Sequence, residues 1–361
     1  MAVESRAQGR IQSLYRHLST HASDASSLLH PVSMTVLRTE QLSRRDGREA
    51  VIIGGMVLDI HALPLSPPAP GTTIPGKVHY VLGGVARNIA DCMSKLGGKP
   101  FFISAVGLDM AGNHLLEHWR SIGRPIEVAA RDNIPLWFEP VSVAKSKRIV
   151  PLVKYVTYVS PNEDELFAMA DALSPGKLYG LSERYNSEKN CPPESLIKML
   201  KPAVILLLEK GIKIVVVTIG ARGAFLCSKE GSILTRAVVE KPQTLGISSE
   251  LHRLISSNCP SHKFHDARHI EGTSRLFALH LPGLPASVKK LTGAGDCLVG
   301  ATLASICEGL NIIQAISVGI AAAKATVEAD SNVPLTFDLI GVADDARSVY
   351  SAAKVVYDGP V

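Results

Sequence analysis

The strongest chemical signal in the 361-residue chain is a run of three small residues and an acid, Gly293-Ala294-Gly295-Asp296, in front of an apolar segment with helical spacing. Small residues at a helix start leave backbone N–H groups uncovered, and the helix dipole favours an anion there. An aspartate in the first turn can accept a proton from an attacking hydroxyl group. The pattern predicts phosphoryl transfer, with N–H groups that hold the transferred charge and Asp296 as the base. The alternative is an ordinary helix start with an acid that stabilises the dipole.

A second glycine turn, Gly83-Gly84, leads into another segment with helical spacing, which carries Asn88. Glycine pairs allow a ligand to approach the backbone closely, and the Asn88 amide can hold sugar hydroxyls. The chain contains neither a GxGxxG fingerprint nor a P-loop, so the classical nucleotide-binding motifs are absent.

Alternating strands and helices must position these residues. Short apolar, β-branched runs predict strands, and apolar residues repeated every three or four positions predict helices. The predicted strands cover 51–57, 101–106, 136–141, 156–159 and 214–219, and the predicted helices cover 85–96, 115–122, 163–173, 194–210 and nearly all of 292–327. This alternation predicts an α/β fold with a doubly wound, mostly parallel sheet flanked by helices.

The chain divides by composition into an N-terminal extension and one domain. Residues 1–48 are rich in Ser, Arg and His, and we expect a targeting or flexible segment. Residues 49–354 form the expected single domain, with a partial, reduced β lid at 60–82 and a Ser-, His- and Pro-rich surface insertion at 241–286.

The segment Arg10–Leu18 resembles the nine-residue peroxisomal import signal, with Arg10-Ile11, five residues, and His17-Leu18. This match predicts a peroxisomal protein that binds an import receptor. A chance match in a short amphipathic helix, a mitochondrial or plastid transit peptide, and a cytoplasmic protein remain alternatives.

Composition excludes several classes of protein. A 46% share of hydrophobic residues excludes a chain disordered throughout, and no apolar run reaches the length of a membrane span. Lys and Arg exceed Asp and Glu only by 38 to 33, without a basic tract, which argues against nucleic-acid binding. Six dispersed cysteines without a CxxC pair indicate reduced thiols in an intracellular protein. Cys259 with His262, His265 and His269 is expected to be a solvated loop rather than a metal site.

Six short motifs occur in the same order as in one enzyme family. They are Gly54-Gly55 with Asp59, Gly83-Gly84 with Asn88, Gly107 with Asp109, Asn162-x-x-Glu165, Thr218-Ile219-Gly220 with Gly223, and Gly293–Asp296. Together they resemble the ribokinase-like, phosphofructokinase-B type carbohydrate kinases. The strings GGVARN and FEPVS are most similar to the pseudouridine kinase branch, and to its plant members in particular. The resemblance implies ATP-dependent phosphorylation of pseudouridine, a small-molecule nucleoside, at its 5′-hydroxyl.

The resemblance also assigns roles on the substrate side and at the base. Asp59, Gly84 and Asn88 should hold the ribose, and Asp296 should be the base, with Gly293, Ala294 and Gly295 as the anion hole. For Arg87, a contact to the nucleobase and a solvated helix charge are both open.

On the nucleotide side, Asn162 and Glu165 should act through water on Mg²⁺ and the phosphates. Thr218, Gly220 and Gly223 should line the ATP pocket. The alternatives without a ligand are a helix capping box for Asn162 and Glu165, and an ordinary strand end for Thr218 and the glycines after it.

Two departures from the family matter. Lys290 stands where the family commonly has an aspartate that helps to bind a monovalent cation, so a K⁺ site is doubtful, and we hypothesise that Lys290 supplies the charge. Only 55 positions separate Gly107 from Asn162, which is too few for the second lid segment and a further strand–helix unit. The family's lid often forms the dimer contact, so a homodimer is an expectation that the shortened lid leaves open. The alternatives are another sugar or nucleoside kinase, of ribokinase or adenosine kinase type, and a weak shortened form that only binds nucleoside.

Overall fold

The computed structural model describes residues 50–67, 74–104, 135–176, 191–229, 234, 247–264 and 275–360. These residues divide into two compact units, which are described separately. The larger unit lies within Asp91–Gly98 and Asn133–Val361, and the smaller within Met1–Ala90 and Lys99–Asp132. The predicted N-terminal extension, the predicted helix at 115–122, and Gly107 and Asp109 lie outside the described residues.

The larger unit is built on a six-stranded sheet in the order β10-β9-β8-β7-β6-β5. Its strands are β5 (Trp137–Phe138), β6 (Tyr158–Val159), β7 (Ile214–Thr218), β8 (Ala224–Ser228), β9 (Arg275–Leu281) and β10 (Lys354–Pro360). The strands from β5 to β7 pair in parallel, and those from β7 to β10 pair antiparallel. The predicted doubly wound α/β fold is confirmed, and its sheet is mixed, with antiparallel pairing along one side.

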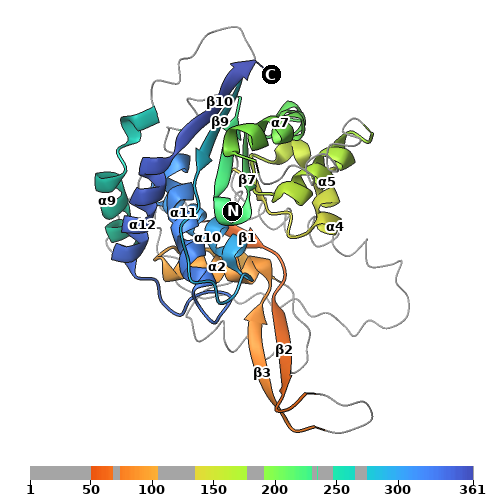
Figure 1. Ribbon diagram of the computed structural model, residues 1–361, viewed down its shortest axis with the longest axis vertical. Helices are drawn as coiled ribbons and strands as arrows, with labels where there is room; N and C mark the ends of the chain where they lie inside the picture. The colour runs from red at the N-terminus through yellow and green to blue at the C-terminus, as the bar shows by residue number, and fades with distance from the viewer. Residues whose placement is uncertain are drawn as a thin grey trace, which may run out of the picture. The chain divides into compact units, whose positions relative to one another are not determined.

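Helices cover both faces of this sheet. They are α4 (Val143–Ser146), α5 (Glu163–Leu173), α7 (Pro193–Glu209), α9 (Ile247–Asn258), α10 (Ala294–Cys307), α11 (Ile312–Val327) and α12 (Leu339–Ala352). Figure 1 shows α4, α5 and α7 on one side of the sheet, and α9, α11 and α12 on the other. Because β7 is covered on both faces, it is a continuous apolar run whose residues Ile214–Val217 are buried, as in the inner strands of α/β sheets.

One prediction about this unit is wrong. The segment 241–286 is not a surface insertion, because it contains α9 and the inner strand β9, which lies between β8 and β10. The side chains of Leu276 and Leu279 in β9 are fully buried. Averaging the composition over 46 positions hid a short apolar strand among polar neighbours.

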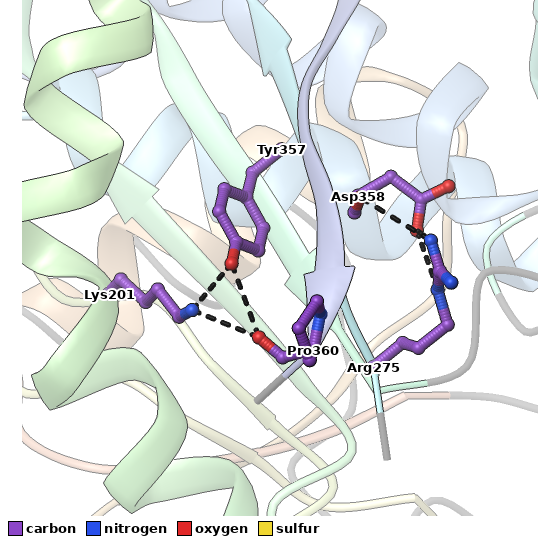
Figure 2. A network of polar contacts seen from close by, with 5 residues as sticks. All are labelled: Lys201, Arg275, Tyr357, Asp358 and Pro360. Atoms are coloured by element: carbon purple, nitrogen blue, oxygen red, sulfur yellow. Dashed lines mark hydrogen bonds and ion pairs between the residues drawn. The ribbon is translucent and has the colours of Figure 1, made fainter. Parts of the chain in front are cut away.

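Side-chain hydrogen bonds join the last strand, β10, to helix α7 on one side and to strand β9 on the other (Figure 2). Lys201 on α7 donates hydrogen bonds to the Tyr357 hydroxyl at 2.5 Å and to the Pro360 carbonyl at 2.9 Å. On the other side, the Arg275 guanidinium of β9 donates to the Asp358 carboxylate from two nitrogens, at 3.1 and 3.2 Å. These contacts include β10 in the fold, although the predicted domain ends at 354, where this strand begins.

The described residues of the smaller unit form two strand pairs. β1 (Val51–Ile53) pairs in parallel with β4 (Phe101–Ile103), and β2 (Val57–Pro64) forms an antiparallel hairpin with β3 (Gly76–Gly83). The hairpin corresponds to the predicted partial lid at 60–82. Its register places Ile60 opposite Tyr80, and these two side chains are largely exposed. An isolated two-stranded hairpin has marginal stability in water, so this ribbon gains little from its own pairing.

Two further observations concern the cysteines and the helices. All six cysteines are described, and each is a free thiol. None of the helices in the described part of the chain has the length and apolarity that a bilayer span requires.

Candidate functional site

The start of α10 has the features of an anion-binding helix terminus. Gly293 is the N-cap residue, has no side chain with which to cap the first N–H groups, and adopts a left-handed conformation with φ +94°. A Cβ at this position would overlap the Asn332 carbonyl oxygen, so glycine is required on two grounds. Asp296 follows in the first turn and is half-buried. The predicted arrangement of small residues and acid at a helix start is therefore present.

Asn162 and Glu165 form a capping box at the start of α5. The Asn162 side chain accepts from the Glu165 backbone N–H, and the Glu165 carboxylate accepts from the Asn162 backbone N–H, each at 2.9 Å. Burial raises the pKa of the Glu165 carboxyl above its usual range. The capping interpretation is confirmed, and the predicted role toward Mg²⁺ and phosphates stays a prediction.

The residues predicted to contact the nucleotide lie together at the carboxyl ends of β6 and β7. The Thr218 backbone N–H donates to the Pro161 carbonyl at 2.9 Å, and an isolated parallel bridge joins Asn162 to Thr218. The chain then turns through Gly220–Arg222, and Arg222 pairs with Glu163 of α5 at 3.5 Å. The carboxyl ends of parallel strands are where open α/β sheets bind ligands.

Glu139 is a functional candidate that the sequence analysis missed. The pairing of Phe138 with Val159 brings Glu139 beside Ser160, whose hydroxyl donates to the Glu139 carboxylate. Trp137 Nε1 donates to the same Ser160 oxygen at 2.6 Å. The signal in the sequence is an acid directly after an aromatic strand, but its partner comes from a strand 21 residues away, which local patterns do not reveal.

The carboxyl group of Glu139 is influenced by acids from two different helices, α5 and α10. Burial first, and then the negative charges of Glu165 and Asp296, raise the pKa of Glu139 to about 8, against the opposing Ser160 hydrogen bond. Glu139 retains some exposed surface, and its raised pKa favours the protonated form over a wider pH range than for an ordinary glutamate. Glu165 and Asp296 each lie close enough to Glu139 to act on its carboxyl group.

The turn after Glu139 carries backbone strain. Val141 has φ +69°, a left-handed conformation that β-branched residues rarely adopt, and its N–H donates to the Glu139 carboxylate. Ser142 then caps α4 by accepting from the Lys145 N–H at 3.4 Å. Strained residues tend to occur at functional sites, which agrees with the position of Glu139 near Asp296.

In the smaller unit, two glycine pairs allow close backbone packing. Gly84 has φ +95°, and a Cβ there would lie 2.5 Å from the Gly55 carbonyl oxygen. A Cβ at Gly54 would lie 2.6 Å from the Ala86 Cβ. Gly54 and Gly84 therefore serve the contact between the β1–β2 turn and the start of α2 (Val85–Lys95), which is sufficient reason for these two glycines. Asp59 lies in β2, opposite Val81.

Arg87 supports Asn88 inside this unit. Arg87 and Asn88 are 5% and 2% exposed, so the interpretation of Arg87 as a solvated helix charge is wrong. The Arg87 guanidinium donates to the Asn88 side-chain oxygen at 2.9 Å and to the Leu82 carbonyl at 3.1 Å. This contact fixes the orientation of the Asn88 amide. The predicted contact of Arg87 to a nucleobase stays a prediction.

Two further features concern metal ions and the loop that carries Lys290. Among the described residues, no group of three or more His, Cys, Asp or Glu side chains is arranged to hold a metal ion. His265 and His269 lie outside these residues. The backbone N–H groups of Lys289 and Lys290 both donate to the Val327 carbonyl, at 2.7 and 3.2 Å, which fixes the loop before the start of α10.

Comparison with known proteins gives concordant matches. Residues 48–133 match the description "pfkB family carbohydrate kinase". The pseudouridine kinase of Arabidopsis thaliana is 39% identical over 377 residues, which cover 85% of this chain and 98% of that protein. The ribokinase of Cryptococcus neoformans in complex with ADP has a TM-score of 0.53 at 16% identity, covering 82% of this chain and 99% of that one. A nucleoside kinase of Methanocaldococcus jannaschii has a TM-score of 0.52 at 15% identity, covering 84% and 99%.

The length of the plant alignment bears on the shortened lid. It spans 377 residues and uses only 85% of a 361-residue chain, so the plant protein has residues at positions where this chain has none. This difference agrees with the short interval between Gly107 and Asn162.

Proposed function

Because the chain belongs to the pfkB family of carbohydrate kinases, we propose that it transfers the γ-phosphoryl group of ATP to the 5′-hydroxyl of pseudouridine. Membership in this family makes the chain a phosphotransferase with an alcohol group as acceptor, acting on a sugar or nucleoside. The observation that supports pseudouridine is the 39% identity across 98% of the plant pseudouridine kinase.

In this proposal the larger unit performs the transfer. Asp296 accepts the proton of the attacking hydroxyl, and the N–H groups of Gly293, Ala294 and Gly295 hold the charge that develops on the phosphoryl oxygens. The start of α10 supports this role, because no N-cap side chain accepts from its N–H groups. Of these three N–H groups, only that of Ala294 has a backbone acceptor among the bonds of the described residues, the Leu291 carbonyl at 3.3 Å. Thr218, Gly220 and Gly223 would line the ATP pocket.

Asn162 and Glu165 would hold Mg²⁺ through water. Burial, and then the nearby charges of Glu165 and Asp296, raise the pKa of Glu139, and a bound cation would offset the repulsive part of this shift. When bound, Mg²⁺ would neutralise charge on the β- and γ-phosphates.

The smaller unit would supply the nucleoside contacts. Asp59, Gly84 and Asn88 would hold the ribose, and Arg87 would keep the Asn88 amide in its binding orientation. A second candidate function is phosphorylation of another sugar or nucleoside, because the ribokinase and nucleoside kinase above share the fold. A weak shortened form that only binds nucleoside is the third, because the alignment indicates a missing internal segment.

The test is release of ADP with pseudouridine, uridine, ribose and adenosine in turn, with Asp296→Ala as the control. Turnover confined to pseudouridine supports the proposal, and turnover on another acceptor supports the second candidate. Binding of nucleoside without turnover of any of the four acceptors supports the third candidate, a form that only binds nucleoside.

Turnover is expected to be independent of K⁺. The Lys290 ammonium would provide, beside the anion site, the positive charge for which the family commonly uses a bound cation. The measurement is kcat with and without added KCl at constant ionic strength. Lys289→Ala is the control, because it removes the charge of an exposed neighbouring lysine and should leave the K⁺ response unchanged. A steep rise of kcat with K⁺ would contradict this role of Lys290.

We also propose peroxisomal import through Arg10–Leu18, which lies outside the described residues. A tagged chain should be found in peroxisomes, and His17→Ala should release it to the cytosol. An identical distribution of both forms would refute the signal.

A further inference from the structure

Two buried thiols lie against the turn that carries Asp296. Cys297 follows Asp296 in α10, and Cys92 lies in the part of α2 that belongs to the larger unit. The Cys92 thiol donates to the Cys297 carbonyl at 3.4 Å, and the Cys297 thiol donates to the Asn332 carbonyl at 3.8 Å. Both cysteine side chains are fully buried.

The Asn332 carbonyl contacts both ends of this turn. It is the group that a Cβ at Gly293 would overlap, and it also accepts the Cys297 thiol. The Cys297 backbone N–H in turn donates to the Gly293 carbonyl at 2.9 Å, which closes the first turn of α10. The turn is therefore held between Asn332 on one side and Cys92 on the other.

The Cys92 thiol is a stable hydrogen-bond donor. Burial, followed by the interaction with Cys297, raises its pKa well above the usual range, so the sulfur keeps its proton. Buried thiols with a raised pKa react slowly with oxidants and electrophiles. The chemistry of this pair thus fits a fixed contact better than a redox function.

We propose that Cys92 and Cys297 are positioning residues, which hold the first turn of α10 so that Asp296 and the anion-binding N–H groups face the reacting atoms correctly. Neither thiol takes part in proton or phosphoryl transfer. An error of about 1 Å in the position of catalytic groups can lower a rate about 100-fold, so anchoring at this turn has a kinetic consequence. The kinetic part of this inference rests on the proposed kinase function.

The kinetic test compares cysteines of equal burial. Cys297→Ala is expected to lower kcat about tenfold and to change KM for ATP less than about twofold, because the turn shifts while the nucleotide contacts at β6 and β7 remain. Cys297→Ser should restore most of kcat, since its hydroxyl can donate to Asn332. Cys227→Ala is the control, because Cys227 is fully buried in β8 and its loss should lower stability without lowering kcat of the folded protein.

A second measurement does not need turnover. Hydrogen–deuterium exchange of the amides at 293–298 should be faster in Cys297→Ala than in wild type and unchanged in Cys227→Ala. If Cys297→Ala fails to fold, Cys92→Ala provides the same comparison, because it removes the donor to the Cys297 carbonyl. Wild-type kcat, or unchanged amide exchange, in the folded variant would overturn the inference. If the wild type phosphorylates no acceptor, the proposed function fails. The hydrogen–deuterium exchange at 293–298 then tests by itself whether the two cysteines hold the first turn of α10.

Discussion

Asp296→Asn is expected to lower kcat about 1,000-fold, because the amide has the shape of the carboxylate but cannot accept the proton of the attacking hydroxyl. KM for ATP should change little, because Asn162, Thr218 and the glycine turn at 220 are untouched. The unfolding free energy should fall by less than about 1 kcal/mol, the usual contribution of an acid to a helix dipole. Steady-state ADP release and thermal unfolding measure the two effects.

The matched control for this substitution is Asp330→Asn. Asp330 belongs to the segment near α10 and pairs with Lys289 at 3.3 Å, but both side chains are mostly exposed. Its loss should leave kcat within about twofold, because exposed ion pairs contribute little. If Asp296→Asn kept more than about a tenth of wild-type kcat, Asp296 would not be the base.

Gly293→Ala is expected to lower both stability and activity. The added Cβ meets the Asn332 carbonyl oxygen, and the left-handed backbone at φ +94° costs a non-glycine residue about 1–2 kcal/mol in addition. Relief of the overlap must move the N–H groups at the start of α10, and loss of one such donor lowers kcat about 100- to 1,000-fold. Thermal unfolding and kcat provide the two readouts.

Gly295→Ala distinguishes an effect on packing within the protein from an effect on binding of the phosphate. A Cβ at Gly295 meets no heavy atom within 4 Å, so this variant should unfold at the wild-type temperature. Any loss of its activity would then reflect crowding of the phosphate. A Gly293→Ala protein with wild-type stability and kcat would show that the close contact with Asn332 has no functional weight.

The parts of the site that depend on local chain chemistry were predictable from the sequence. The start of α10 and the Asn162–Glu165 capping box each lie within four consecutive residues, and the structure contains both. In contrast, β5 and β6 contain only two residues each, although longer strands were predicted at 136–141 and 156–159. β5 ends before Glu139, and β6 begins only at Tyr158 because the helical turn Val153–Tyr155 comes just before it.

Features that depend on distant partners were not predictable. Arg87 is buried because the Asn88 side chain and the Leu82 carbonyl receive its guanidinium, which a count of charges on one helix face does not reveal. β9 was missed because its apolar residues are surrounded by polar sequence and find their partners in β8 and β10. The raised pKa of Glu139 likewise depends on Glu165 and Asp296, which are far away in the chain.

The most direct test of the proposed chemistry is to incubate the purified full chain with ATP, Mg²⁺ and pseudouridine and to identify the product by mass spectrometry. We expect pseudouridine 5′-phosphate, formed with one ADP per molecule and absent with Asp296→Asn. A folded chain that binds ATP and pseudouridine but forms no phosphate ester would contradict the proposal.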